Sequence, residues 1–315
     1  MGQALYELLL SYNSGLSWTS LAARWRLSRR NGIKLAFSAL CAGSLRASEA
    51  TDEATQFPGL TRSIPPRALQ ALTGSQFADS VANVDRQQRE RAILGQFFEG
   101  NLPGFLRKLA PVKLSYRLDS GKTLAATIFV LPEYLAIGSD SDFLRIPMNL
   151  HTAVAIANRF GFVLPTKKMV DAIYVQSTCR FTPQPLPAGP QMMSTEYYQV
   201  HNAMIDQQSQ TRDFPFGALS SGHKKDVVIT NRLTKRPGQI AIYGWHRGAG
   251  APIQPLSTVH GAGYADYSHG IRLVGRMAMI DGALRSVHDV LRDSVLANVL
   301  SDEGAIRLAS AYGNA

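Results

Sequence analysis

The strongest constraint on the fold is a change in the spacing of apolar residues near residue 110. Residues 84–98 carry apolar side chains at helical spacing, on one side of a predicted helix. Residues 112–131, VKLSYRLDSGKTLAATIFVL, instead form two β-type runs joined by the turn sequence DSGK, which predicts a β-hairpin. Helices and strands in separate blocks, rather than in regular βαβ units, indicate an α+β fold.

The rest of the chain continues this mixed order. Helices are predicted at 151–160, 166–176 (with Thr166 as N-cap), 194–208, 284–292 and 294–300. Strand composition is found at 133–148, 226–233, 238–246 and 270–280. We therefore predict one α+β catalytic domain over 84–310, with a mixed or antiparallel β-sheet core and flanking helices.

The N-terminal segment, residues 1–48, is predicted to be basic and helical, and three interpretations of it remain open. In the first, residues 18–36 form a nucleic-acid-binding helix-turn-helix, with Arg29 and Arg30 opening the recognition helix. In the second, Arg29, Arg30 and Lys34 precede the apolar LAFSALCAG of an export signal cleaved after Ala47. In the third, the segment is a basic helical extension.

Residues 49–83 are predicted to be a linker. The stretch SEATDEATQFPGLTRSIPP, at 48–66, is polar, rich in threonine and interrupted by prolines. The chain contains no run of about 18 apolar residues, so the sequence predicts no transmembrane helix.

The overall composition favours a folded, basic protein. Hydrophobic residues make up 45% of the chain and charged residues 18%, as in globular rather than disordered proteins. The formal net charge of +10 favours an anionic partner such as nucleic acid, an anionic membrane surface or an acidic wall polymer. The two cysteines, Cys41 and Cys179, exclude a disulfide framework and a CxxC zinc ribbon.

Reactive side chains gather in the last third, above all in VHGAGYADYSHGIRLVG at 259–275. Several histidines and aspartates lie near the ends of predicted strands, and neighbouring strands are only about 5 Å apart. We expect them to form one catalytic centre. Its candidate residues are His223, Asp226, His246, His260, Asp266, Ser268 and His269.

Two kinds of chemistry suit such a centre. Imidazole and carboxylate groups can bind zinc, although the chain has neither H-E-x-x-H nor His-x-His. Alternatively, one histidine acts as a general base on water or on Ser268, with an aspartate orienting it. Adjacent residues of a strand point to opposite faces, so Ser268 and His269 would not pair with each other. A third possibility is that these histidines only satisfy backbone groups.

Basic and aromatic residues beside the histidines are candidates for substrate binding. A lysine or arginine there would hold an anionic group of the substrate. The candidates are Lys224, Lys225, Tyr264, Tyr267 and Arg272.

The segment His260–Gly261 followed by SHGIRL at 268–273 resembles part of the L,D-transpeptidase catalytic signature. That signature has His-Gly, a gap, and then Ser-His-Gly-Cys-Ile/Val-Arg-Leu/Met. The nucleophilic cysteine is absent here, because Ile271 follows Gly270 directly, so the covalent thiolate chemistry of that family cannot run. The resemblance covers fourteen of 315 residues and implies a cell-wall class of substrate.

These observations together predict an exported (periplasmic or extracellular) or envelope-associated hydrolase. Its substrate would be amide bonds of an anionic, cell-wall-like polymer or peptide. One alternative is a DNA-binding protein that works through residues 18–36 and would be cytoplasmic. Another is a non-catalytic wall-binding module.

Overall fold

The computed structural model describes residues 63–307. The chain divides into two units, Met1–Ala47 and Ser48–Ala315, and the described residues belong to the second unit. The helix-turn-helix predicted at 18–36, the export signal and the first part of the predicted linker therefore lie outside the described residues. Every helix within 63–307 is too short or too polar to cross a bilayer.

The described residues form an α+β fold, as predicted. The helices are α4 (Gly74–Ser80), α5 (Arg86–Phe98), α6 (Leu150–Phe160), α7 (Lys167–Gln176), α8 (Thr195–Thr211), α9 (Val287–Arg292) and α10 (Ala297–Leu300). The strands are β1 (Ala110–Arg117), β2 (Thr123–Val130), β3 (Ala136–Ser139), β4 (Asp142–Arg145), β5 (Phe162–Val163), β6 (Cys179–Arg180), β7 (Ser220–Ser221), β8 (Lys225–Val227), β9 (Ile242–His246), β10 (Pro252–Ser257), β11 (His269–Gly270), β12 (Val274–Ile280) and β13 (Ala283–Ser286).

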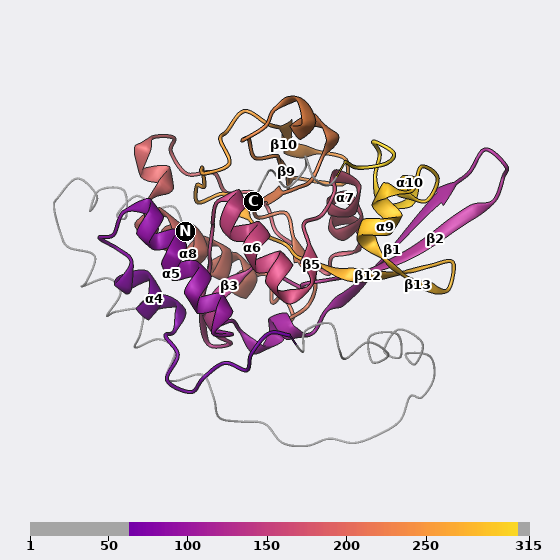
Figure 1. Cartoon of the computed structure of the whole chain (residues 1–315). Helices are drawn as coiled ribbons and strands as arrows, with labels where there is room; N and C mark the ends of the chain where they lie inside the picture. Colours follow the sequence, from indigo (N-terminus) through magenta and orange to yellow (C-terminus); the bar gives the residue numbers. More distant parts are fainter. Residues whose placement is uncertain (1–62, 308–315) are drawn as a thin grey trace, which may run out of the picture. The chain divides into compact units, whose positions relative to one another are not determined.

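The predicted hairpin is confirmed as β1 and β2, which begin the larger sheet. Its strand order is β1-β2-β12-β13, with β5 also paired to β12. The strand pairs of this sheet are all antiparallel. Figure 1 shows β12 and β13 beside the long β1–β2 hairpin, although more than a hundred residues separate them in sequence.

A second sheet carries four of the twelve candidate site residues, Lys225, Asp226, His246 and His269. Its strand order is β10-β9-β8-β11. Strands β9 and β10, and likewise β8 and β9, are antiparallel, whereas β8 and β11 are parallel. The parallel pair places His269 opposite Lys225 and Gly270 opposite Asp226. This sheet is therefore mixed, whereas the larger sheet is antiparallel; the sequence prediction leaves both forms open.

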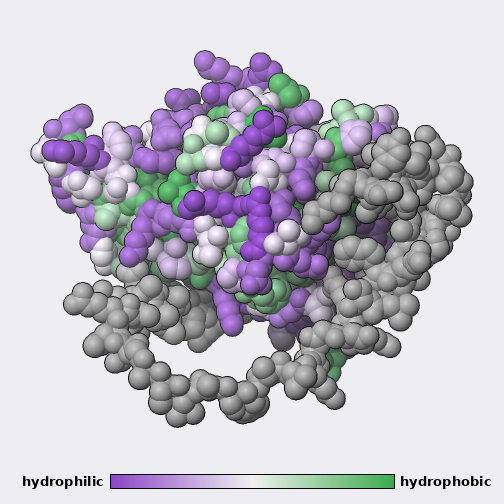
Figure 2. All heavy atoms as spheres, turned by 180° about the vertical axis from the view of Figure 1, so that it is seen from behind, coloured by the Kyte–Doolittle hydropathy of each residue, from purple (hydrophilic) through white to green (hydrophobic). Residues whose placement is uncertain are grey.

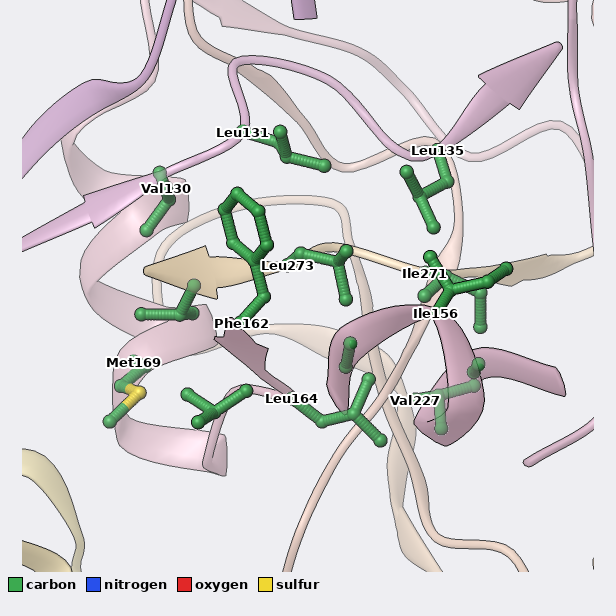
Figure 3. Packing of buried hydrophobic residues seen from close by; sticks show 14 of the residues in the cluster. Val130, Leu131, Leu135, Ile156, Phe162, Leu164, Met169, Val227, Ile271 and Leu273 are labelled. Carbon is green, nitrogen blue, oxygen red and sulfur yellow. The ribbon is translucent and has the colours of Figure 1, made fainter. Parts of the chain in front are cut away.

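Segment 268–273 connects the two sheets through the hydrophobic core. The backbone N–H groups of Leu131 and Leu135 donate to the carbonyls of Leu273 and Ile271, at 3.0 and 2.8 Å. Figure 3 shows these four side chains packed together with Phe162 and other buried residues. By contrast, hydrophilic residues cover much of the face seen in Figure 2. The stretch that carries SHGIRL is thus part of the interior.

Local capping explains where several helices begin. The Thr166 hydroxyl accepts a hydrogen bond from the Met169 N–H, which confirms the predicted cap of α7. Asp85 and Gln88 form a capping box at the start of α5. Ser286 caps α9, so the predicted helix at 284–292 is shorter, and its first residues belong to β13.

The last part of the predicted linker, from residue 63, belongs to the folded unit. A capping box of Thr73 and Gln76 opens α4, and Phe77 of this helix is buried in the core. A Cβ at Gly74 would lie 2.5 Å from the backbone of β4, so α4 packs directly against that strand. The sequence did not predict this helix, because the segment is polar, its buried residues are few and two prolines precede it.

Candidate functional site

The centre of the candidate site is the carboxylate of Asp266, just before β11. Its Oδ1 accepts hydrogen bonds from the Ser268 N–H (2.8 Å) and the Ser268 hydroxyl (2.5 Å). Its Oδ2 accepts one from the Tyr264 hydroxyl at 3.0 Å. Burial raises the pKa of Asp266, but nearby His269 and the hydrogen bonds from Ser268 outweigh it, so the pKa lies below its usual value. Asp266 is therefore an ionised, firmly held carboxylate.

His269 lies next to this carboxylate and is 0% exposed. Its Nε2 is 3.9 Å from Asp266 Oδ2, and neither ring nitrogen has a hydrogen-bond partner among the described residues. Burial lowers the pKa of His269 to about 4, with Asp266 opposing part of that shift. The imidazole is therefore neutral near pH 7, with two unused nitrogens.

The other members of this group are Tyr264, Lys225 and His260. Lys225 is opposite His269 in the β8–β11 pair. The ring of His260 stacks on Tyr264, with centroids 4.3 Å apart. We call Lys225, His260, Tyr264, Asp266, Ser268 and His269 the Asp266 cluster.

Lys224 is buried. Two adjacent lysines such as Lys224 and Lys225 are more often both exposed to solvent. The Nζ of Lys224 donates to the Tyr267 carbonyl at 2.6 Å and lies 3.3 Å from His201 Nδ1. Burial, together with the positive charge of Arg145, lowers the pKa of Lys224 to about 7. Tyr267 is also buried, and its hydroxyl is bonded to the backbone of Leu186.

His223 belongs to a different group, the Glu133 cluster of Glu133, Arg145, Asp206 and His223. The Nε2 of His223 lies 2.8 Å from Glu133 Oε1, and Arg145 forms an ion pair with the other Glu133 oxygen at 2.9 Å. Arg145 also pairs with Asp206 at 2.9 Å. Although burial opposes ionisation, His223 and Arg145 hold the pKa of Glu133 well below its usual value. His223 is therefore committed to this internal network.

Asp226 and Arg272 are joined through Tyr134. The Tyr134 hydroxyl donates to Asp226 Oδ2 at 2.8 Å, and the Arg272 guanidinium lies 4.3 Å from the centroid of the Tyr134 ring. Burial raises the pKa of Asp226 to about 6, although Arg272 and Tyr134 lower it in part.

Arg272 does not have the exposed position expected of a residue that binds substrate. It is 0% exposed and donates to the backbone carbonyls of Leu131 and Ser220, at 2.8 and 2.7 Å. These bonds tie the segment that follows β11 to two other segments. The physical reason is that a buried guanidinium must use its donors inside the protein.

His246 pairs with yet another carboxylate, that of Asp171 on α7. The Nε2 of His246 is 3.1 Å from Asp171 Oδ1, which also accepts from the Tyr243 hydroxyl at 2.8 Å. Lys167 donates to the other Asp171 oxygen at 2.7 Å. The His246 ring stacks on Tyr174 with centroids 4.6 Å apart.

The structure thus replaces the single expected centre by four groups, built on the carboxylates of Asp266, Glu133, Asp226 and Asp171. It brings His260 and His269 together with Asp266, whereas His223 and His246 pair with Glu133 and Asp171. Among residues 63–307, no three His, Cys, Asp or Glu side chains are placed to hold a metal ion. The zinc hypothesis therefore has no ligand set in that part of the chain.

Sequence analysis missed several residues of these groups. Glu133 and Arg145 lie in and beside short strands far from the histidine-rich stretch, and His201 is a lone histidine on α8. For Trp245 the sequence offered one indication of a special position, because this residue lies between Gly244 and His246 at the end of a predicted strand. Its backbone has a φ of +58°, a conformation that is uncommon for a bulky residue and often marks a turn or a functional site.

Comparison with protein-family models, with curated proteins and with solved structures finds no match to this chain. The similarity to the L,D-transpeptidase signature accordingly remains one of fourteen residues. Cys179 does not supply the absent nucleophile beside His269, because it is buried in β6 and burial raises the pKa of its thiol to about 11.

Proposed function

We propose that the protein is a hydrolase in which His269 is the general base and the nearby carboxylate of Asp266 stabilises its protonated form. The observation that carries the proposal is the state of His269, a neutral buried imidazole with two unpartnered nitrogens, 3.9 Å from a carboxylate. A base must be unprotonated at the working pH and must have a lone pair free for the proton. Leaving a buried polar group without a partner costs about 1–3 kcal/mol, and a catalytic role would account for that cost.

Water, rather than Ser268, is the nucleophile in this proposal. The Ser268 hydroxyl already donates to Asp266, so it serves to hold the carboxylate. His269 takes a proton from water while the water oxygen bonds to the amide carbonyl carbon. The C–N bond then breaks, and the imidazolium returns the proton to the leaving amine. The products are a carboxylic acid and an amine, and Asp266 stabilises the imidazolium between the two steps.

The proposed substrate is an amide bond of an anionic, cell-wall-like peptide, which implies an exported or envelope-associated protein. The net charge of +10 supports an anionic substrate. In this proposal Lys225, which is opposite His269 in the sheet, would hold its negative group. The wall-like character rests on the resemblance of SHGIRL to the transpeptidase signature.

The test is hydrolysis of purified peptidoglycan stem peptides, measured as the release of new amino groups. His269→Ala should lower turnover by at least about 10²-fold, the loss typical of a removed acid–base group. His151→Ala is the matched control, because His151 is exposed on α6, and it should retain wild-type turnover. Chelators should have no effect if the reaction needs no metal. Unchanged turnover in a folded His269→Ala variant would refute the proposal.

A non-catalytic wall-binding module is the second candidate. The full burial of Ser268 and His269 favours it, because a catalytic base must be reached by water. Under this alternative, the wild-type protein would sediment with insoluble peptidoglycan but release no amino groups. His269→Ala would then leave sedimentation unchanged.

A further inference from the structure

Two buried nitrogen atoms near the Asp266 cluster have no hydrogen-bond partner within residues 63–307. They are Nε2 of His201 on α8 and Nε1 of Trp245 on β9. The exposed fraction is 1% for His201 and 5% for Trp245. The two rings lie edge to face with centroids 6.3 Å apart, and both contact Tyr267, at 5.0 and 6.3 Å. Because buried polar groups are nearly always bonded, two such neighbours call for an explanation.

Both nitrogens are hydrogen-bond donors. The indole nitrogen of Trp245 can only donate. Burial and the nearby charge of Lys224 hold the pKa of His201 well below its usual value, so this ring is neutral. When Lys224 is protonated, its Nζ donates to Nδ1 of His201 at 3.3 Å, which places the imidazole hydrogen on Nε2. The partner that each of these nitrogens lacks is therefore an acceptor.

Positive charge borders the same two rings. Lys224 contacts His201 directly, and the Nζ of Lys225 lies 5.1 Å from the centroid of the Trp245 ring. The negative charge of Asp266 opposes the lowering of the pKa of both lysines. The oxygens of Asp266, however, already accept hydrogen bonds from Ser268 and Tyr264. An anionic acceptor suits this environment better than a neutral one.

The backbone at Trp245 is an independent sign of a specialised position. Gly244 and Trp245 have φ values of +108° and +58°. This conformation is unfavourable for tryptophan, and such strain persists where the surrounding structure enforces it, often at binding sites. The backbone N–H of Trp245, unlike its indole N–H, has a partner: it donates to the Lys224 carbonyl at 3.1 Å. The turn thus fixes the indole beside Lys225.

We propose that His201 and Trp245, with Lys225 beside them, form a subsite for a carboxylate of the ligand. The ligand class is a short peptide with a free C-terminal carboxylate. The subsite deepens the proposed function and rests on it only in placing the ligand beside His269, which is opposite Lys225. Binding of the carboxylate requires no turnover.

Fluorescence of Trp245 provides the test. The chain has three tryptophans, Trp18, Trp25 and Trp245, so the double substitution Trp18→Phe/Trp25→Phe in the full chain leaves Trp245 as the only indole. Adding His269→Ala prevents turnover. This protein is titrated with N-acetyl-alanyl-alanine and, as a control, with N-acetyl-alanyl-alaninamide at equal ionic strength. The free carboxylate should give a saturable change and bind at least about tenfold more tightly than the amide, as expected for one charge-assisted hydrogen bond.

Two substitutions of His201 form a matched pair. His201→Asn keeps an acceptor for Lys224 but has no donor at the Nε2 position, so affinity for the carboxylate should fall at least about tenfold. His201→Gln keeps an N–H near Nε2 and should retain most of the affinity. Thermal melting checks that each variant is folded. If His201→Asn does not fold, the comparison of carboxylate with amide decides the matter alone.

The proposal is overturned if carboxylate and amide peptides bind equally, if neither gives a saturable change, or if folded His201→Asn binds like its parent. Its failure is distinguishable from failure of the hydrolase proposal. Carboxylate-selective binding without amide hydrolysis by the wild-type protein would support the subsite and refute the hydrolase. Hydrolysis that depends on His269 without carboxylate selectivity would do the reverse.

Discussion

Replacing Gly270 by alanine should destabilise the protein through the packing of Tyr134 against β11. A Cβ at Gly270 would lie 2.6 and 2.7 Å from two ring carbons of Tyr134 and 2.8 Å from the Cβ of Lys224. These distances are about 1 Å below the optimum for carbon contacts. Tyr134 cannot simply turn away, because its hydroxyl is bonded to Asp226 at 2.8 Å and it is fully buried. Overpacking of this kind costs about 1–3 kcal/mol.

Loss of the Tyr134–Asp226 hydrogen bond would add about 1.5–3 kcal/mol, as is usual for a bond to a charged group. The overpacking alone should lower the melting temperature by about 2–12 °C for a folded region of this size. Gly263→Ala is the matched control, since no atom lies within 4 Å of its added Cβ. Urea and thermal unfolding followed by circular dichroism measure both variants. Equal stability of the two variants would show that Tyr134 does not pack against β11 as described.

The remaining predictions concern buried charges and the N-terminal unit. Because the folded pKa of Lys224 is about 7 against 10.5 unfolded, stability should rise by up to about 5 kcal/mol between pH 7 and 10.5; urea unfolding of Lys224→Met should lack that rise. Asp226, with a folded pKa of about 6 against 3.8, favours the folded state below pH 4 and loses up to about 3 kcal/mol of that stabilisation as pH rises through 6, so Asp226→Asn should remove this part of the pH profile. His269, with a folded pKa of about 4 against 6.5, contributes up to about 3 kcal/mol above pH 6.5 that is lost as pH falls towards 4; a His269→Asn variant with the same acid sensitivity would contradict the assignment. Removing residues 1–47 should leave the melting temperature unchanged, because the described core extends from Ile64 to Ile306; if that removal instead abolishes a salt-sensitive affinity for duplex DNA, the DNA-binding alternative is favoured.

Features that depend on neighbouring residues were predictable from the sequence. The β1–β2 hairpin follows from two β-type runs and one turn, and the start of α7 follows from Thr166 and the apolar spacing behind it. Each depends on contacts within a few positions, and local propensity acts over that range. The α+β class follows from the order of such elements. Helix α4 escaped prediction, because its burial depends on β4, about 65 residues further along the chain.

The candidate site was predictable in composition but not in its pairings. The stretch 259–275 itself contains Tyr264, Asp266, Ser268 and His269, whose contacts span only a few residues. The carboxylates that pair with His223 and His246 belong to Glu133 and Asp171, which are 90 and 75 positions away in the sequence.

Whether a charged side chain is buried was likewise decided by tertiary structure. The sequence marked Lys224, Lys225 and Arg272 as equally plausible contacts for a substrate. Packing of β11 against β8 and of residues 131–135 against 271–273 encloses Lys224 and Arg272 and leaves Lys225 partly exposed. Residue type determines which charges a chain carries, but a pKa depends on the solvent and partners that distant segments remove or supply.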